Sequence, residues 1–354
     1  MKLRHLHIED YKMFKDFDIS FVDKNDEPLP IIVLAGVNGS GKTSLLEMIV
    51  EYQDFTKGHI FADSNITYEY DTEEERLKKE KYFFLPEKIV YFPAGIDDTK
   101  KVAYEFVQTF YYFLKEKDYR PSEITEHFHN YMKNIFDGLD IGFKYSHLDK
   151  DDNVWFSNGE NEKYYYTSED NGKDKNIFTI DELSTGEKTL LSKIMYLYFK
   201  DYKDKIILID EPELSLHPSW QNKVLKIYEN FAKQNNCQII IATHSPHIIG
   251  SAKPEYLRVL KKVDNKIEVA KYTQSYGLEF SQILTNIMGV DYLRTPDVAK
   301  KMDRVKDLIV QNKYDSNEFK EEWISLENML GKNYLDLKLL KLEIASRRKR
   351  ASGN

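Results

Sequence analysis

The chain has 354 residues, of which 41% are hydrophobic and 31% are charged, and its formal net charge is −8. This length and composition allow one large core and a smaller module, and they exclude a disordered low-complexity protein. The acidic balance excludes a surface that attracts nucleic acid as a whole. A nucleic-acid contact would need a local basic patch. Arg347–Arg350 is one candidate, although such a run is more often a solvated chain end.

The apolar pattern and the cysteine count exclude two further classes. No run approaches the roughly 20 apolar residues that a membrane helix requires, and the first residues lack the apolar core of a signal peptide. Cys237 is the sole cysteine, which excludes an internal disulfide and a cysteine-based zinc site. We therefore expect a cytoplasmic protein without a membrane partner.

The first 50 residues predict three strands and a helix. Leu3–Ile8 and Phe17–Phe21 alternate apolar and polar residues, as half-buried strands do. Ile31–Ala35 is apolar throughout, which is typical of a central strand covered on both faces. After a glycine-rich loop, Leu45–Val50 carries apolar residues at helical spacing.

Residues from about 55 to 180 are less regular, and we expect them to form an inserted α/β lobe. Helices are predicted at Asp71–Lys81, Tyr104–Leu114 and Ile124–Phe136. Strands are predicted at Lys88–Pro93, Phe143–Phe156, Tyr164–Thr167 and Phe178–Ile180.

From residue 183 onward helices and buried strands alternate. They are predicted at Leu190–Tyr198 (helix), Lys205–Asp210 (strand), Trp220–Phe231 (helix) and Gln238–Ala242 (strand). This order predicts a parallel βαβ unit with a right-handed crossover. A hairpin is expected about Asp264-Asn265, and the chain beyond it has helical spacing. We therefore expect a domain over residues 1–275, which includes the lobe, and a helical module over 276–350.

A phosphate-binding loop is the first motif that carries chemistry. Gly36 to Thr43 reads G-V-N-G-S-G-K-T and matches G-x-x-x-x-G-K-S/T between a predicted strand and a predicted helix. Backbone N–H groups and the start of the helix would bind the phosphates of ATP, Lys42 would reach the β- and γ-phosphates, and the Thr43 hydroxyl would bind Mg²⁺. The predicted nucleotide contacts are Gly36, Asn38, Gly39, Ser40, Gly41, Lys42, Thr43 and Ser44.

Two carboxylates follow a buried strand at Asp210 and Glu211. In an enzyme with a phosphate loop, the first acid orders Mg²⁺ and the second activates the attacking water. We assign Asp210 as a metal residue and Glu211 as the catalytic base.

Leu183 to Lys188, which reads L-S-T-G-E-K, opens the predicted helix before these acids. It resembles the ABC signature L-S-G-G-Q in the variant form of soluble chromosome-maintenance, repair and phage-defence ATPases. That resemblance implies that Ser184 and Gly186 bind the γ-phosphate held by the loop of a second protomer. Thr185 and Glu187 depart from the consensus, and a plain helix cap is the alternative role of the string.

His244 follows the next buried strand, where ABC ATPases carry a histidine that contacts the γ-phosphate, so the resemblance implies a catalytic role for it. The string D-E-P-E-L-S-L-H-P from Asp210 resembles the overcoming-lysogenization-defect (OLD) and Septu-type, PtuA-like AAA family, which is related to RecF- and SMC-like ATPases. It places His217 in the loop that crosses the dimer interface, with a helix-start residue as the alternative. Lys12 either approaches nucleotide or DNA, as in those proteins, or is an exposed lysine.

Two departures limit the resemblance, which covers residues 1–50 and about 183–250. Tyr91-Phe92-Pro93-Ala94 stands where the glutamine loop of ABC ATPases would fall, so the Mg²⁺ shell is expected to differ. OLD nucleases also carry a nuclease domain with clustered acids, but residues 276–350 contain no such cluster, and we do not expect nuclease activity.

His5 and His7 share a strand face, but no further metal ligand accompanies them in the sequence, and we interpret them as surface histidines.

These motifs predict an α/β fold of the ABC type, with a mostly parallel central sheet and antiparallel N-terminal strands. The resemblance implies an ATPase that forms a head-to-tail homodimer, or a higher homo-oligomer, around Mg-ATP. It implies a separately encoded nuclease or other toxic effector as partner, in prokaryotic anti-phage defence. A RecF- or SMC-like ATPase that binds DNA is the alternative, and a transporter subunit is a further, weaker one.

Overall fold

The computed structural model describes residues 2–51, 66–70, 89–94, 99–139, 144–157, 177–198, 202–270, 272 and 274–352. The chain divides into two compact units, Met1–Ile283 and Leu284–Asn354. The helix predicted at Asp71–Lys81 and the strand predicted at Tyr164–Thr167 lie outside the described residues. No described helix combines the length and the apolar character needed to cross a membrane.

A six-stranded, mostly parallel sheet forms the centre of the first unit. Its strands are β3 (Ile31–Ala35), β5 (Ile89–Phe92), β9 (Ile206–Asp210), β10 (Gln238–Ala242), β11 (Leu257–Val263) and β12 (Lys266–Ala270). They lie in the order β12-β11-β3-β10-β9-β5, and β12 pairs antiparallel with β11 while the others run parallel. Every residue of β3, β9 and β10 is buried, as their continuous apolar runs predict.

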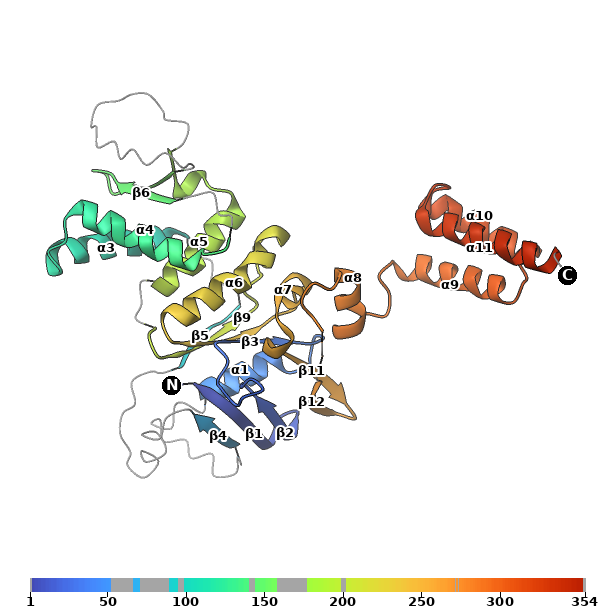
Figure 1. Cartoon of the computed structure of the whole chain (residues 1–354), viewed down its shortest axis with the longest axis horizontal. Helices are drawn as coiled ribbons and strands as arrows, with labels where there is room; N and C mark the ends of the chain where they lie inside the picture. Colours follow the sequence, from blue (N-terminus) through green and yellow to red (C-terminus); the bar gives the residue numbers. More distant parts are fainter. Residues whose placement is uncertain are drawn as a thin grey trace. The chain divides into compact units, whose positions relative to one another are not determined.

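Two helices, α1 (Lys42–Glu51) and α6 (Pro218–Gln234), cover opposite faces of this sheet (Figure 1). The chain passes through α1 from β3 toward the β5 edge, whereas it passes through α6 from β9 back to β10. Right-handed crossovers that run in opposite directions along a sheet place their helices on opposite faces. The carboxyl ends of β3, β9 and β10 therefore meet at one edge, where such folds bind ligands.

A second, antiparallel sheet is formed by β1 (Leu3–Tyr11), β2 (Phe14–Ser20) and β4 (Ile66–Tyr70), in the order β2-β1-β4. The buried side chain of Gln238, at the start of β10, joins this sheet to the central one. Its Oε1 accepts from the Leu3 N–H at 2.8 Å, and its Nε2 donates to the carbonyls of Leu3 and Leu29 at 3.0 and 3.1 Å. The predicted α/β class, with its mostly parallel sheet and antiparallel N-terminal strands, is confirmed.

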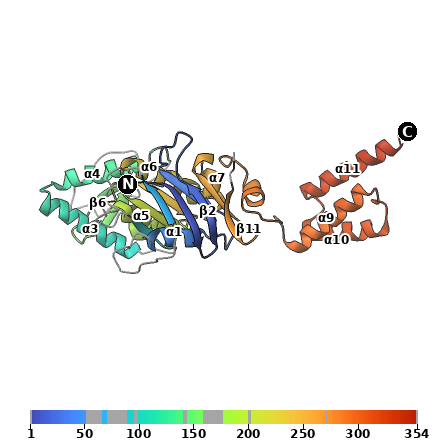
Figure 2. The ribbon, with the colours of Figure 1, turned by 90° about the horizontal axis from the view of Figure 1, so that it is seen from below.

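Between these elements lies a small lobe of two helices and a sheet. It contains α3 (Thr99–Glu116), α4 (Pro121–Ile135), β6 (Lys144–Leu148), β7 (Val154–Ser157) and β8 (Ile177–Thr179). Aromatic side chains fill its core, with ring centroids 4.4 Å apart for Phe106 and Phe128 and 5.0 Å apart for Phe106 and Tyr145. α3 packs against α5 (Thr185–Tyr198) and α4 packs against α6, at one end of the first unit (Figure 2).

The hairpin of β11 and β12 lies at the edge of the central sheet opposite β5. Asp264 and Asn265, with φ of +47° and +66°, form its two-residue turn, as the sequence predicts. The short helix α7 (Pro246–Ser251) follows β10 and packs against α6.

The second unit is helical and has its own core. It contains α9 (Pro296–Val310), α10 (Asn317–Leu330) and α11 (Leu335–Ser352). Apolar side chains from all three helices meet in one buried cluster, among them Val305, Phe319 and Leu337.

Candidate functional site

The phosphate loop joins β3 to α1 at the carboxyl edge of the sheet. Gly41 has a φ of +88°, and a Cβ at this position would lie 2.8 Å from Cζ of Phe14. Gly36 has a φ of +147°, and a Cβ there would lie 2.4 Å from the carbonyl oxygen of Leu260. Both positions require glycine, because a side chain would strain the backbone and meet atoms already in place. The loop is thus held between the N-terminal strands and β11.

The other predicted nucleotide contacts differ in exposure. Asn38 and Gly39 are exposed at the tip of the loop, and Thr43 is exposed at the start of α1. Ser40 is buried and Ser44 is half-buried.

Lys42 is buried in the centre of the loop, with 4% of its surface exposed. Its Nζ donates to the carbonyls of Gly36 and Val37 at 2.9 and 3.2 Å, and to Oγ of Ser40 at 3.4 Å. Burial lowers the pKa of Lys42 to about 8, against the opposing effect of nearby carboxylates, of which Asp210 is the strongest. The ammonium is therefore surrounded by acceptors and close to acids, but is still partly desolvated.

Thr43 and Asp210, predicted to share a metal ion, are in direct contact. Oγ1 of Thr43 donates to Oδ2 of Asp210 at 2.9 Å, so the start of α1 meets the end of β9. The phenol of Tyr91, on β5, donates to the same carboxylate oxygen at 3.5 Å. Hydroxyl and carboxylate oxygens are the ligands that Mg²⁺ prefers, so this pair fits the ion.

Glu211 and His244 face each other across the ends of β9 and β10. Nε2 of His244 lies 3.8 Å from Oε1 of Glu211. Glu211 has a φ of +47°, a conformation that costs energy for a residue with a side chain, and its N–H donates to the Ala242 carbonyl at 2.8 Å. Burial, and then the charge of Lys42, lower the pKa of His244, so the imidazole is neutral at pH 7.

A third acid, Glu213, belongs to the same site although the sequence analysis assigned it no role. Its Oε1 accepts hydrogen bonds from Oγ1 of Thr243 at 2.8 Å and from the N–H of His244 at 2.7 Å. In the sequence, only its place two residues after the assigned base Glu211 points to it.

Ser184 and Gly186 lie at the start of α5. The Ser184 N–H donates to Oε2 of Glu187 at 3.0 Å and the Glu187 N–H donates to Ser184 Oγ at 3.4 Å, which is a capping box. Ser184 Oγ also donates to the same carboxylate oxygen at 2.7 Å. A Cβ at Gly186 would lie 3.5 Å from Cδ1 of Trp220 and 3.6 Å from the backbone nitrogen of His217. Among the described residues, no hydrogen bond joins Ser184 to the phosphate loop of its own chain.

The segment after Glu211 leads from the acids to α6. Ser215 has a φ of +66°, and His217 is the N-cap of α6, with its Nδ1 accepting from the Ser219 N–H at 3.3 Å. This geometry corresponds to the helix-start alternative for His217. Lys193 on α5 donates to the carbonyls of Pro212 and Leu214 at 2.7 and 3.2 Å, so α5 is bonded to the first part of this segment.

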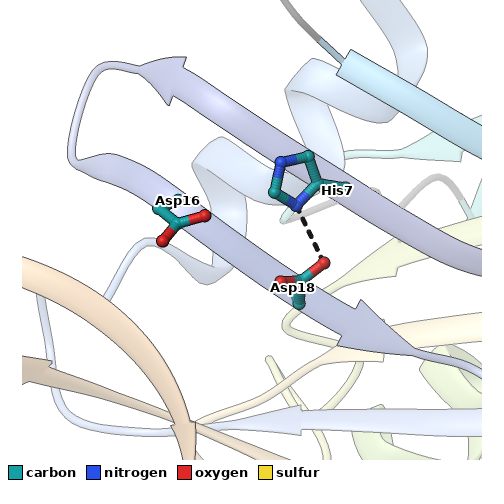
Figure 3. Close-up of side chains that lie close together, drawn as sticks. All are labelled: His7, Asp16 and Asp18. Atoms are coloured by element: carbon teal, nitrogen blue, oxygen red, sulfur yellow. Dashed lines mark hydrogen bonds and ion pairs between the residues drawn. The ribbon is translucent and has the colours of Figure 1, made fainter.

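A separate cluster lies on the exposed face of the N-terminal sheet. His7 pairs with Asp18 across β1 and β2, and its Nδ1 lies 2.8 Å from Oδ1 of Asp18 (Figure 3). Asp16 completes a group whose donor atoms lie within 4.8 Å of one another. The expectation that no further ligand accompanies His7 is wrong, because strand register brings the two aspartates beside it. Asp16 and Asp18 are exposed and His7 is half-buried, and the hydrogen bond accounts for the proximity of His7 and Asp18.

Two family models match the chain. An AAA domain matches residues 5–50, which contain the phosphate loop. An AAA ATPase domain matches residues 93–249, which contain the signature, the acids and His244.

Individual proteins match over similar regions. The retron Ec83 probable ATPase of Escherichia coli is 31% identical over 188 residues, which cover 49% of this chain and 34% of that protein. The Septu protein PtuA of Bacillus thuringiensis is 30% identical over 154 residues, which cover 41% of this chain and 37% of that protein. The matches thus span about a third of each relative's length. The SMC head domain from Thermotoga maritima has a TM-score of 0.45 and 14% identity, with 77% of this chain and 99% of that chain covered.

Proposed function

We propose that this chain is an ATPase that binds Mg-ATP and hydrolyses it. The AAA ATPase domain that matches residues 93–249, and the similarity to a retron ATPase and to the Septu protein PtuA, support the proposal. One observation carries the proposal. Lys42, the Thr43–Asp210 pair and Glu211 converge at the carboxyl edge of one parallel sheet, from segments up to 169 residues apart.

The proposed binding roles follow from the donors and acceptors in place. The loop N–H groups and the start of α1 would bind the phosphates, because a helix N-terminus favours anions. Lys42 would exchange the loop carbonyls that it now contacts for phosphate oxygens. Thr43 and Asp210 would hold Mg²⁺, which when bound neutralises charge on the β- and γ-phosphate oxygens.

The proposed hydrolytic roles fall to the two residues that face each other. The Glu211 carboxylate would orient a water and accept its proton. His244 is neutral at pH 7 because its pKa is lowered, so it would offer a hydrogen bond to the γ-phosphate without bringing a second proton into the site.

We further propose that two protomers complete each other's sites. Ser184 and Gly186 lie at the start of α5, where a hydroxyl and N–H groups make an anion site. Among the described residues, the hydroxyl and the N–H of Ser184 bond to Glu187 and not to the phosphate loop of its own chain. In a head-to-tail dimer each pair would contact the γ-phosphate bound by the other protomer. Closure would then switch a separately encoded effector, in the setting of anti-phage defence that the relatives suggest.

The test is to measure ATP hydrolysis and solution mass together, for the wild type and for Glu211→Gln. We expect the variant to lose hydrolysis and to form a dimer only with ATP and Mg²⁺. An active Glu211→Gln variant would contradict the assigned base, and a monomer under all conditions would contradict the dimer. Hydrolysis that rises with DNA and falls steeply with salt would favour the RecF-like alternative.

A further inference from the structure

Glu213 bridges the segment after β9 to the segment after β10. Its Oε1 accepts two hydrogen bonds, from the side chain of Thr243 and from the backbone of His244, at 2.8 and 2.7 Å. Both distances are those of well-formed hydrogen bonds, and a carboxylate acceptor makes them stronger than neutral ones. His244, which carries the imidazole of the site, is therefore anchored to Glu213 through its own backbone N–H.

The carboxyl group holds this position at a cost. Its other oxygen, Oε2, is buried and has no hydrogen-bond partner among the described residues. Burial raises the pKa of Glu213, against the two hydrogen bonds that favour the charged form, and the nearby charge of Glu211 raises it further. A buried acceptor without a partner is unfavourable for stability. A group kept under these conditions is better explained by the geometry that it imposes than by the stability that it adds.

The anchor extends on both sides of His244. Oγ1 of Thr243, which donates to Glu213, accepts from the Ser245 N–H at 2.9 Å. Oγ of Ser245 in turn donates to Gln221 at 2.6 Å and caps the start of α7. The backbone of residues 243–245 is thus held from the Glu213 side and from the α6 side, which fixes the Cα from which the His244 imidazole extends toward Glu211.

We propose that Glu213 is a positioning residue for hydrolysis, which holds the backbone of His244 so that its imidazole stays opposite Glu211 at the γ-phosphate end of the site. This inference rests on the proposed ATPase function. Glu213 touches neither nucleotide nor water in this role, because its bonded oxygen is directed at Thr243 and His244. Its effect should therefore fall on the rate of hydrolysis and leave ATP affinity largely unchanged.

The first test compares Glu213→Ala, Glu213→Gln and His244→Ala. Ala removes the acceptor, and we expect kcat to fall by about tenfold to a hundredfold, because small displacements of active-site groups lower rates by such factors. The Kd for ATP should stay within about twofold of the wild-type value. Gln keeps an oxygen acceptor and should restore most of the rate. The double variant Glu213→Ala/His244→Ala should be no slower than His244→Ala, because Glu213 acts through His244.

Glu229 provides the matched control. It is another largely buried glutamate, held by Lys233 at 2.7 Å and by Tyr256 at 3.0 Å, outside the site. Glu229→Gln should leave kcat at the wild-type value even if it lowers the melting temperature. The proposal would be overturned if the kcat losses of Glu213→Ala and His244→Ala multiplied in the double variant. A loss of kcat in Glu229→Gln as large as that in Glu213→Ala would also overturn it.

A second readout does not depend on activity. Hydrogen exchange of the amides at 243–245 should be faster in Glu213→Ala than in the wild type, and Glu213→Gln should restore the protection. Unchanged exchange would refute the positioning role even in an active enzyme. A wild type that binds but does not hydrolyse ATP, with the expected exchange pattern, would instead refute the proposed function and leave the anchor in place.

Discussion

The phenol of Tyr91 donates a hydrogen bond of 3.5 Å to Oδ2 of Asp210, the oxygen that also accepts from Thr43. Burial and the charge of Asp210 raise the pKa of Tyr91 to about 12, so the phenol remains a neutral donor at every working pH. Tyr91 stands where ABC ATPases would carry the glutamine loop. We therefore expect Tyr91 to take the place of that loop beside the proposed Mg²⁺ site.

Tyr91→Phe tests this substitution. The variant removes one hydroxyl and leaves the ring, so packing against β9 should be preserved. We expect the Mg²⁺ concentration for half-maximal hydrolysis to rise by about three- to tenfold, the effect of losing one hydrogen bond. A magnesium titration at saturating ATP measures it. An unchanged titration would remove Tyr91 from the metal environment.

We expect ATP binding to depend on pH through Lys42. Its pKa of about 8 in the nucleotide-free protein means that the ammonium loses its proton as pH rises through that value, whereas phosphate contact favours the charged form. We expect ATP affinity to fall by up to about tenfold per pH unit above 8, with proton uptake on binding. Calorimetry in two buffers of different ionisation enthalpy measures the uptake, and Lys42→Met should bind weakly with no such dependence.

The same shift has a consequence for folding, with a definite sign. The pKa is lowered from 10.5, so between pH 8 and 10.5 the unfolded chain binds more protons than the folded one. The contribution of Lys42 to stability therefore grows as pH rises across this window and is lost as pH falls through it.

Gly41 and Gly39 form a matched pair for testing the loop. Both have positive φ, of +88° and +75°, but only a Cβ at Gly41 would meet other atoms, 2.8 Å from Phe14 and 3.0 Å from Met13. Gly41→Ala should lower the free energy of unfolding by about 2 kcal/mol more than Gly39→Ala, because it adds overpacking to backbone strain. Urea unfolding of both variants measures the difference, and equal losses would contradict the close approach of the N-terminal strands.

Gln238 is expected to stabilise the junction of the two sheets. Gln238→Ala leaves the N–H and carbonyl of Leu3 and the carbonyl of Leu29 without their buried partner. We expect the free energy of unfolding to fall by about 3 kcal/mol. Gln234→Ala, at an exposed position on α6, should change it by less than about 0.5 kcal/mol.

The elements that could be predicted are those whose signal is local. Ile31–Ala35, Ile206–Ile209 and Ile239–Ala242 are apolar throughout, and the structure buries all of them as parallel neighbours. The hairpin turn at Asp264-Asn265 could also be predicted from the sequence, because these residue types tolerate the left-handed backbone conformation.

The relationships that could not be predicted depend on register and on turns between distant segments. The contact of Tyr91 with Asp210 exists because β5 pairs with β9, 119 residues along the chain. The approach of Asp18 to His7 depends on one particular register of β1 and β2. Glu213 reaches His244 only because the segment after β9 turns back, and neither composition nor periodicity encodes that turn.

Glu187 is expected to shorten the life of the proposed dimer. Glu187→Gln, introduced into the hydrolysis-deficient Glu211→Gln background, should slow dissociation of the ATP-bound dimer several-fold, because it replaces a carboxylate beside Ser184 with a neutral amide. Glu182→Gln is the control, since Glu182 accepts from the Thr179 N–H in a similar capping box at the preceding short helix, Ile180–Glu182. Equal dissociation rates for the two variants would contradict this effect.

The hydroxyl of Ser184 can donate one hydrogen bond, and within the chain it donates this bond to the Glu187 carboxylate. A phosphate arriving from a second protomer would compete with a carboxylate for that hydrogen, and the two anions would repel each other. Each association of two protomers would thus require the Glu187 side chain to turn to solvent. It would bond to Ser184 again once the phosphate has left. In the proposed dimer, a helix start capped in this way would favour separation of the protomers after each turnover, without any contribution from the effector.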